Sequence, residues 1–147
     1  MKPRKTSKRI AGMVIGVITG ILAMVFVNEM LYPENKSENK IKAEIKRITD
    51  ELNNVTPLMV NENTRFDSIA IKPNNTLQYY YTVTNVYCDS VNIVNFESRY
   101  KPMLIQNIKS KDGLAFILNY KIYVIYQYRD KEGKVFSTID IDPNVFN

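Results

Sequence analysis

Residues 120–143 read YKIYVIYQYRDKEGKVFSTIDIDP, and this stretch decides the fold class. Alternate side chains in its first half share one face of a strand, namely Tyr120, Ile122, Val124, Tyr126 and Tyr128. This period of two is typical of a strand with one buried face. Asp130–Gly133 supplies a turn, and alternate residues from Val135 to Ile141 form a returning strand, which Pro143 ends. The stretch therefore predicts an antiparallel hairpin.

A second hairpin is predicted upstream. Within residues 77–84, apolar and aromatic side chains alternate with their neighbours, as Leu77, Tyr79, Tyr81 and Val83. Residues 66–72 are a plausible partner strand, because Pro73-Asn74-Asn75 between them has the composition of a turn.

Two helices complete the predicted domain. Apolar residues recur at spacings of four and three over residues 41–55, as Ile41, Ile45, Ile48, Leu52 and Val55, and Pro57 ends the pattern. Residues 96–110 predict a second helix with Phe96, Tyr100, Leu104 and Ile108 on one face, although Pro102 must start or kink it. The order α-β-β-α-β-β favours an α+β domain in which both helices cover one face of a four-stranded antiparallel sheet.

The N-terminal third has a different character. The chain has 147 residues and a net charge of +5, and Lys2, Arg4, Lys5, Lys8 and Arg9 account for all of that excess. Residues 10–27, IAGMVIGVITGILAMVFV, carry no charge and span about 27 Å as a helix, close to the thickness of a bilayer core. The basic flank places the N-terminus in the cytoplasm.

The predicted organisation is therefore a cytoplasmic basic segment (1–9), a transmembrane anchor (10–32), a linker (33–40) and an extracytoplasmic α+β domain (41–147). The protein is expected in the cytoplasmic (inner) membrane with a single pass, its domain lying in the periplasm if the cell is Gram-negative. A cleaved signal peptide is the competing interpretation, but the apolar run is longer than usual and ends in bulky residues.

Three glycines follow one face of the predicted span. Gly12, Gly16 and Gly20 are spaced four apart, as in helix pairs whose backbones approach closely. Contact with a second copy or with a partner helix is one interpretation. The other is that glycine is simply common in membrane helices.

The inventory of side chains excludes most catalytic designs. The chain has no His and one Cys, Cys88, so imidazole-based triads, His metal sites and thiolate zinc cages are excluded, and no cofactor is expected. Asp130, Asp140 and Asp142 do not form the D-x-D-x-D-G loop of a calcium site. Apart from residues 1–9 the charge is balanced, so no nucleic-acid partner is expected.

Four side chains are candidates for partner binding. Tyr80 and Tyr123 fall on the strand faces opposite the predicted core, where an exposed Tyr favours contact with other molecules. Arg65 and Asp67, two apart on one strand, could bind a polar group of a ligand. The plainer alternatives are that Tyr is a good strand residue and that Arg65 and Asp67 form an ion pair.

Three segments carry a resemblance to a family. They are PLMVNENTRFDS (57–68), LQYYYTVTN (77–85) and YVIYQYRDKEGKVFSTIDIDP (123–143). Together they resemble a group of small bacterial exported or membrane-anchored proteins with the pattern P-x-x-V-[DN]-x-x-T-R-x-D-S, a Tyr-rich strand and Y-x-Y-x-D-x-x-G. The resemblance implies an extracytoplasmic bacterial setting and assigns no catalytic residue. The cysteine pair that many members carry is absent here.

The sequence thus favours a membrane-anchored, non-catalytic module that binds a protein partner or self-associates through its membrane helix. One alternative is a protective protein of the immunity or exclusion type. The other is a hydrolase that uses only carboxylates such as Asp67, Asp89 or Glu97. No motif pairs two of these acids, so an enzyme is not expected.

Overall fold

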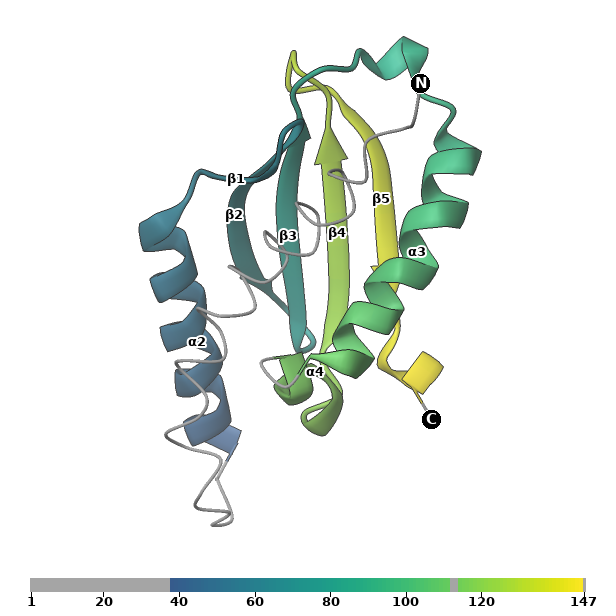
Figure 1. Ribbon diagram of the computed structural model, residues 1–147. Helices are drawn as coiled ribbons and strands as arrows, with labels where there is room; N and C mark the ends of the chain where they lie inside the picture. The colour runs from purple at the N-terminus through teal and green to yellow at the C-terminus, as the bar shows by residue number, and fades with distance from the viewer. Residues whose placement is uncertain (1–37, 112–113, 147) are drawn as a thin grey trace, which may run out of the picture.

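A computed structural model describes residues 38–111 and 114–146 (Figure 1). The predicted basic segment and membrane anchor, most of the linker, and the glycines Gly12, Gly16 and Gly20 lie outside these residues. Within the two described ranges, no helix combines the length and apolar character needed to cross a membrane.

The two helices and two hairpins predicted for the α+β domain are present. The helices are α2 (Glu38–Val55) and α3 (Ile93–Ser110), and the hairpins pair β2 (Thr64–Lys72) with β3 (Thr76–Val83) and β4 (Tyr123–Arg129) with β5 (Val135–Ile141). The sequence did not indicate a short strand β1 (Leu58–Asn61) or a short helix α4 (Ala115–Asn119). Two 3-10 turns, η1 (Cys88–Ser90) and η3 (Pro143–Phe146), complete the described elements.

The predicted four-stranded antiparallel sheet is wrong. The sheet has five strands in the order β1-β2-β3-β4-β5, and it is mixed because β3 and β4 run parallel. The physical reason is the connection from β3 through α3 and α4, which returns the chain to the end of the sheet at which β3 began. A parallel neighbour requires a crossover of this length.

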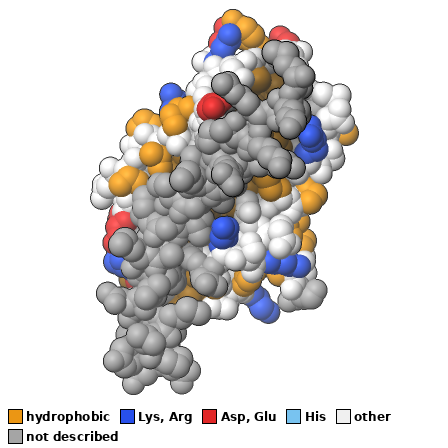
Figure 2. All heavy atoms as spheres, in the orientation of Figure 1, with side chains coloured by type: hydrophobic (Ala, Val, Ile, Leu, Met, Phe, Trp, Pro, Cys, Tyr) orange, Lys and Arg blue, Asp and Glu red, His pale blue; other side chains and the backbone are white. Residues whose placement is uncertain are grey.

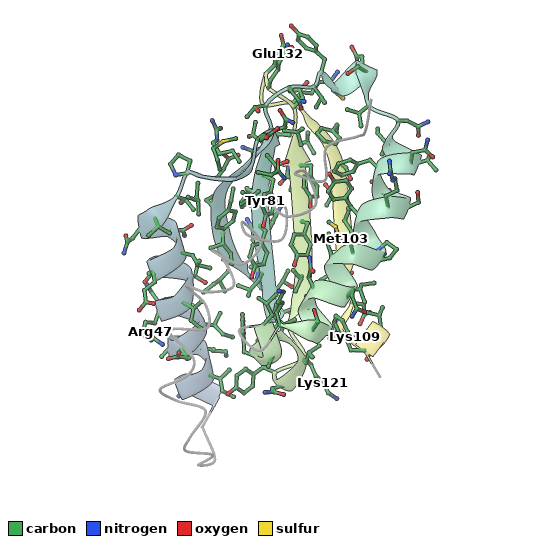
Figure 3. All side chains as sticks on the ribbon, in the orientation of Figure 1. Arg47, Tyr81, Met103, Lys109, Lys121 and Glu132 are labelled. Atoms are coloured by element: carbon green, nitrogen blue, oxygen red, sulfur yellow. The ribbon has the colours of Figure 1, made fainter. Side chains whose placement is uncertain are left out.

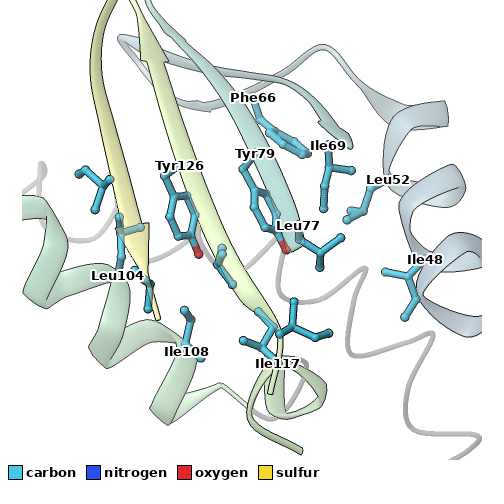
Figure 4. Packing of buried hydrophobic residues seen from close by; sticks show 14 of the residues in the cluster. Ile48, Leu52, Phe66, Ile69, Leu77, Tyr79, Leu104, Ile108, Ile117 and Tyr126 are labelled. Carbon is cyan, nitrogen blue, oxygen red and sulfur yellow. The ribbon is translucent and has the colours of Figure 1, made fainter. Parts of the chain in front are cut away.

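The helices enclose one hydrophobic core on one face of the sheet. Helix α2 packs against β2, and α3 packs against β5, as the ribbon also shows (Figure 1). Figure 4 shows Ile48 and Leu52 of α2 and Leu104 and Ile108 of α3 directed at the same cluster. Of the predicted apolar positions on α2, Ile45, Ile48 and Leu52 are buried, whereas Val55 is 46% exposed.

Helix α3 begins earlier than predicted and contains its proline. The Asn92 side chain accepts a hydrogen bond from the Asn95 backbone N–H at 3.0 Å and so caps the helix start. Pro102 lies inside the helix on its exposed side. The predicted apolar face is confirmed, because Leu104 and Ile108 are buried and Phe96 and Tyr100 pack against the core.

A row of tyrosines crosses the middle of the core face. Tyr79 stacks on Tyr126 with ring centroids 5.1 Å apart, and Tyr81 stacks on Tyr128 at 5.4 Å. Figure 3 shows Tyr81 on the central strands, between the helices at the two sides. Burial raises the pKa of all four phenols, because a phenolate would lose its hydration there. These side chains are core residues.

Candidate functional site: the open face of the sheet

The three described α-helices contribute to the core on one side of the sheet, which leaves the opposite side without a described helix. We call that side the open face. Strand alternation assigns to it the residues between the core positions. Its principal members are Arg65, Asp67, Gln78, Tyr80, Thr82, Tyr123, Ile125, Gln127 and Arg129. The four candidates for partner binding that the sequence analysis gave therefore lie on one surface, namely Arg65, Asp67, Tyr80 and Tyr123.

Asp67 is the centre of a small polar cluster on this face. The register between β2 and β3 shifts between Phe66 and Ser68, so Asp67 sits at a bulge. The Nε of Arg65 donates to Asp67 Oδ1 at 2.5 Å, and the Thr82 hydroxyl donates to Oδ2 at 2.6 Å. Both carboxylate oxygens are thus occupied. The arrangement suits a fixed structural or binding group better than a general base.

Arg129 joins this cluster and was not singled out by the sequence analysis. It pairs with Thr82 across the parallel β3–β4 ladder, and its guanidinium carbon lies 5.3 Å from the centre of the Tyr80 ring. Its Nε is buried and has no hydrogen-bond partner among the described residues. With Arg65, Asp67 and Arg129 together, the cluster carries one net positive charge. This net charge favours contact with an anionic group.

Tyr123 lies at the other end of the same face. Tyr123 pairs with Thr76 of β3. On β4 it precedes Arg129 by six residues, a distance of about 20 Å along the strand. Between the two ends lie half-buried Ile125 and a hydrogen bond of 2.8 Å from Gln78 Nε2 to Gln127 Oε1. The open face therefore offers an aromatic end, an apolar middle and a cationic end.

The carboxylates of the hydrolase alternative are not brought together. Asp67 is on the open face, whereas Glu97 of α3 accepts a hydrogen bond from the Ser137 hydroxyl on the helix side. Asp89 belongs to η1, and its side chain is exposed and contacts Lys134. Over the described ranges, no group of three His, Cys, Asp or Glu side chains could hold a metal ion.

Asp130 has a structural role. One of its oxygens accepts from the Cys88 N–H at 2.8 Å, and the other accepts from the Glu132 and Lys134 N–H groups at 2.9 Å. Burial opposes ionisation, but these three donors lower the pKa of Asp130 below its ordinary value. The carboxylate thereby fastens the β4–β5 turn to the connection that follows β3. Cys88 is a half-buried free thiol.

Charged side chains are dispersed over the part of the molecule that grey atoms leave uncovered in Figure 2. In Figure 2, Lys and Arg side chains of the described residues are separated by hydrophobic and uncharged ones. The side chains seen there do not form one continuous basic surface.

Comparison with known proteins identifies a family and a fold. The family described as "Domain of unknown function (DUF8479)" matches residues 39–137. No curated protein matches the chain. A Pseudomonas aeruginosa structure described as a "putative secreted protein" superimposes with a TM-score of 0.60 at 15% identity, covering 77% of this chain and 100% of that one.

The pilotin EpsS of the Vibrio vulnificus type 2 secretion system is also similar. Its TM-score is 0.56 at 8% identity, and the match covers 75% of this chain and 94% of the pilotin. At these identities the likeness concerns the fold.

Proposed function

The chain belongs to the DUF8479 family, and we propose that its described domain is a non-catalytic module that binds a protein partner outside the cytoplasm. The observation that carries the proposal is the open face, where Arg129, Tyr80 and Arg65 form a cationic and aromatic cluster beside half-buried Ile125. Tyrosine and arginine are the residue types that contribute most to protein interfaces.

The nature of the cluster supports binding over catalysis. Asp67 has both oxygens occupied, and the carboxylates that a hydrolase would need lie on different surfaces. The Arg129 guanidinium beside the Tyr80 ring favours a partner that presents a carboxylate at this point of the face. Tyr123 and Ile125 extend the contact along β4.

The location rests on the sequence and is supported by the fold. The basic residues of segment 1–9 and the uncharged run 10–27 favour an anchor with the domain outside. Two proteins with this fold are a "putative secreted protein" and a pilotin of a secretion system, which fits that side of the membrane. A reporter that is active only outside the cytoplasm should therefore be active when fused after Asn147. Activity of a cytoplasm-specific reporter at the same point would contradict this location.

Capture of a partner from membranes tests the binding proposal. The full chain, cross-linked in intact cells and purified, should capture a protein partner. Replacement of Tyr80 by Ser together with Arg129→Gln should weaken that capture about tenfold or more, as loss of an interface hot spot does. The matched control is Lys101→Gln on α3, an exposed residue away from the open face. Equal capture by both variants, each with an unchanged melting temperature, would contradict the proposal.

A further inference from the structure

Two adjoining hollows lie at the end of the domain where α2 begins. Their volumes are about 610 and 390 Å³, and they share Lys42, Ile45, Asn75 and Ile122 in their walls. The start of α2, the β2–β3 turn and the connection from α4 to β4 form them. We call the pair the lysine hollow, because Lys42, Lys46, Lys72 and Lys121 all line it.

The lining of the lysine hollow is basic at the rim and apolar inside. Among the described residues that line either part there is no Asp or Glu. Lys46 Nζ forms an ion pair with Asp50 Oδ2 at 2.5 Å. Lys72 and Lys121 are exposed, and within the described residues no ion pair is found for either of them. Buried Ile45, Leu77 and Ile122 and half-exposed Ile71 supply apolar walls. This combination suits an anion that carries an apolar chain.

Lys72 lines the larger part of the hollow and Lys121 the smaller part, and fixed turns join the backbone around them. Asn74 and Asn75 in the β2–β3 turn and Lys121 before β4 have positive φ values of 61°, 51° and 49°. Thr76 pairs with Lys72 on one side and with Tyr123 on the other. The Tyr123 N–H donates to the Asn75 carbonyl oxygen at 3.0 Å, which joins the two turns directly. Backbone hydrogen bonds therefore fix the positions of the Lys72 and Lys121 backbones.

The position of the hollow in the chain indicates its occupant. Helix α2 starts at Glu38, so only residues 33–37 separate it from the proposed membrane anchor. Five extended residues reach about 18 Å at most. The end that carries the lysine hollow must then lie close to the bilayer. Figure 3 shows Lys121 at this end and Glu132 at the opposite end.

We propose that the lysine hollow binds the phosphate headgroup of an anionic phospholipid in the membrane that anchors the chain. The inference rests on the proposed anchor. Lys72 and Lys121 contact the phosphate as point charges, and the apolar walls receive the start of an acyl chain. Such a contact would fix the tilt of the domain and leave the open face free to meet its partner.

Lysine labelling in nanodiscs tests this inference on the full chain. Discs of phosphatidylcholine alone are compared with discs that also contain phosphatidylglycerol, and the rate at which a water-soluble reagent modifies each lysine is measured by mass spectrometry. Lys72 and Lys121 should react about fivefold more slowly in the anionic discs, the factor expected for a lysine near an anionic surface, and high salt should remove the difference. Lys101 should react at one rate in both discs.

The outcomes separate this inference from the anchor. A chain that does not co-purify with either disc contradicts the anchor and the inference together. Incorporation with equal labelling of Lys72 and Lys121 in both discs overturns the inference alone. If soluble glycerol phosphate, added to neutral discs, protects Lys72 and Lys121 as well as the anionic lipid does, the hollow is a site for free phosphate esters, and the inference is overturned.

A matched pair of variants supplies a second readout. In anionic discs, backbone hydrogen exchange over residues 72–76 should be slower than in neutral discs for the wild-type chain and for Lys101→Gln. In the double variant Lys72→Gln with Lys121→Gln, the difference between the discs should disappear. A difference that persists in the double variant would contradict the assigned lysines.

Discussion

Asn53 completes the edge of β2 where β1 has already ended. Strand β1 pairs with β2 only as far as Phe66, so the backbone groups of Ile69 have no strand neighbour on that side. The Asn53 amide donates to the Ile69 carbonyl oxygen at 2.8 Å and accepts from the Ile69 N–H at 2.9 Å. One side chain thereby satisfies two backbone groups and fastens α2 to the sheet.

Replacement of Asn53 by Ala should lower the free energy of unfolding by about 1–3 kcal/mol, because the two part-buried groups of Ile69 lose their partner. The matched control is Asn54→Ala, the next residue on the same helix, which is exposed. Both changes alter helix propensity equally, so the difference between the two denaturant midpoints isolates the edge contact. Equal free energies of unfolding for the two variants would show that water replaces the Asn53 amide without loss of stability.

At the level of elements, β3 and β4 pack against each other through stacked tyrosines. Their parallel register places Tyr79 beside Tyr126 and Tyr81 beside Tyr128, and burial raises the pKa of each phenol. The unfolded chain ionises these phenols near pH 10, whereas the folded chain keeps them protonated. Since the folded state then binds more protons than the unfolded state, stability is complete below about pH 10 and falls as the pH rises above it.

Alkaline titration of tyrosinate absorbance should show this linkage: these phenols ionise above pH 10 together with loss of the fold. Tyr79 offers the sharpest variant, because its buried hydroxyl has no hydrogen-bond partner within the described part of the chain. Tyr79→Phe should leave the fold as stable as before or stabilise it by about 1 kcal/mol, and should move alkaline unfolding to higher pH. A loss of stability on removal of this hydroxyl would mean that a partner holds it.

The elements that sequence reasoning missed are those too short to show a period. Strand β1 has four residues and α4 has five, so neither displays a hydrophobic repeat. The hairpins and the α2 pattern were predicted because alternation and helical spacing persist over several turns of chain. The parallel pairing was not, because two hairpins satisfy the same alternation in either order, and only the crossover through α3 decides between them.

The open face shows the same division. Alternation correctly placed Tyr80 and Tyr123 opposite the core, and it also places Arg129 there, six residues after Tyr123. The contact of Arg129 with Tyr80 could not be predicted from the sequence, because it depends on the parallel β3–β4 register. The role of Arg65 and Asp67 in partner binding remains a prediction.

In the molecule as a whole, the core and the open face lie on opposite sides of the sheet, and the lysine hollow lies at the end where α2 begins, with core residues Ile45, Leu77 and Ile122 in its walls. The buried hydrophobic residues run from Ile45 in α2 to Ile141 in β5. The described elements that carry these residues pack into one core cluster with one another. Arg129 lies six residues along β4, about 20 Å, from Tyr123 at the α2 end, so binding at the Arg129 end of the open face and contact at the α2 end can occur together.

The fragment of residues 38–147 should consequently fold by itself, with a cooperative thermal transition within about 5 °C of that of the full chain in detergent. The fragment 57–147 is the control, and it should not fold, because it lacks Ile45, Ile48 and Leu52, which are buried against the sheet. If the longer fragment instead lost its cooperative transition, or if its tyrosines ionised before unfolding, residues 1–37 would have to be part of the core. An apolar segment packed on the domain is not available to a bilayer, so that outcome would remove the membrane anchor and, with it, the reason for lipid at the lysine hollow.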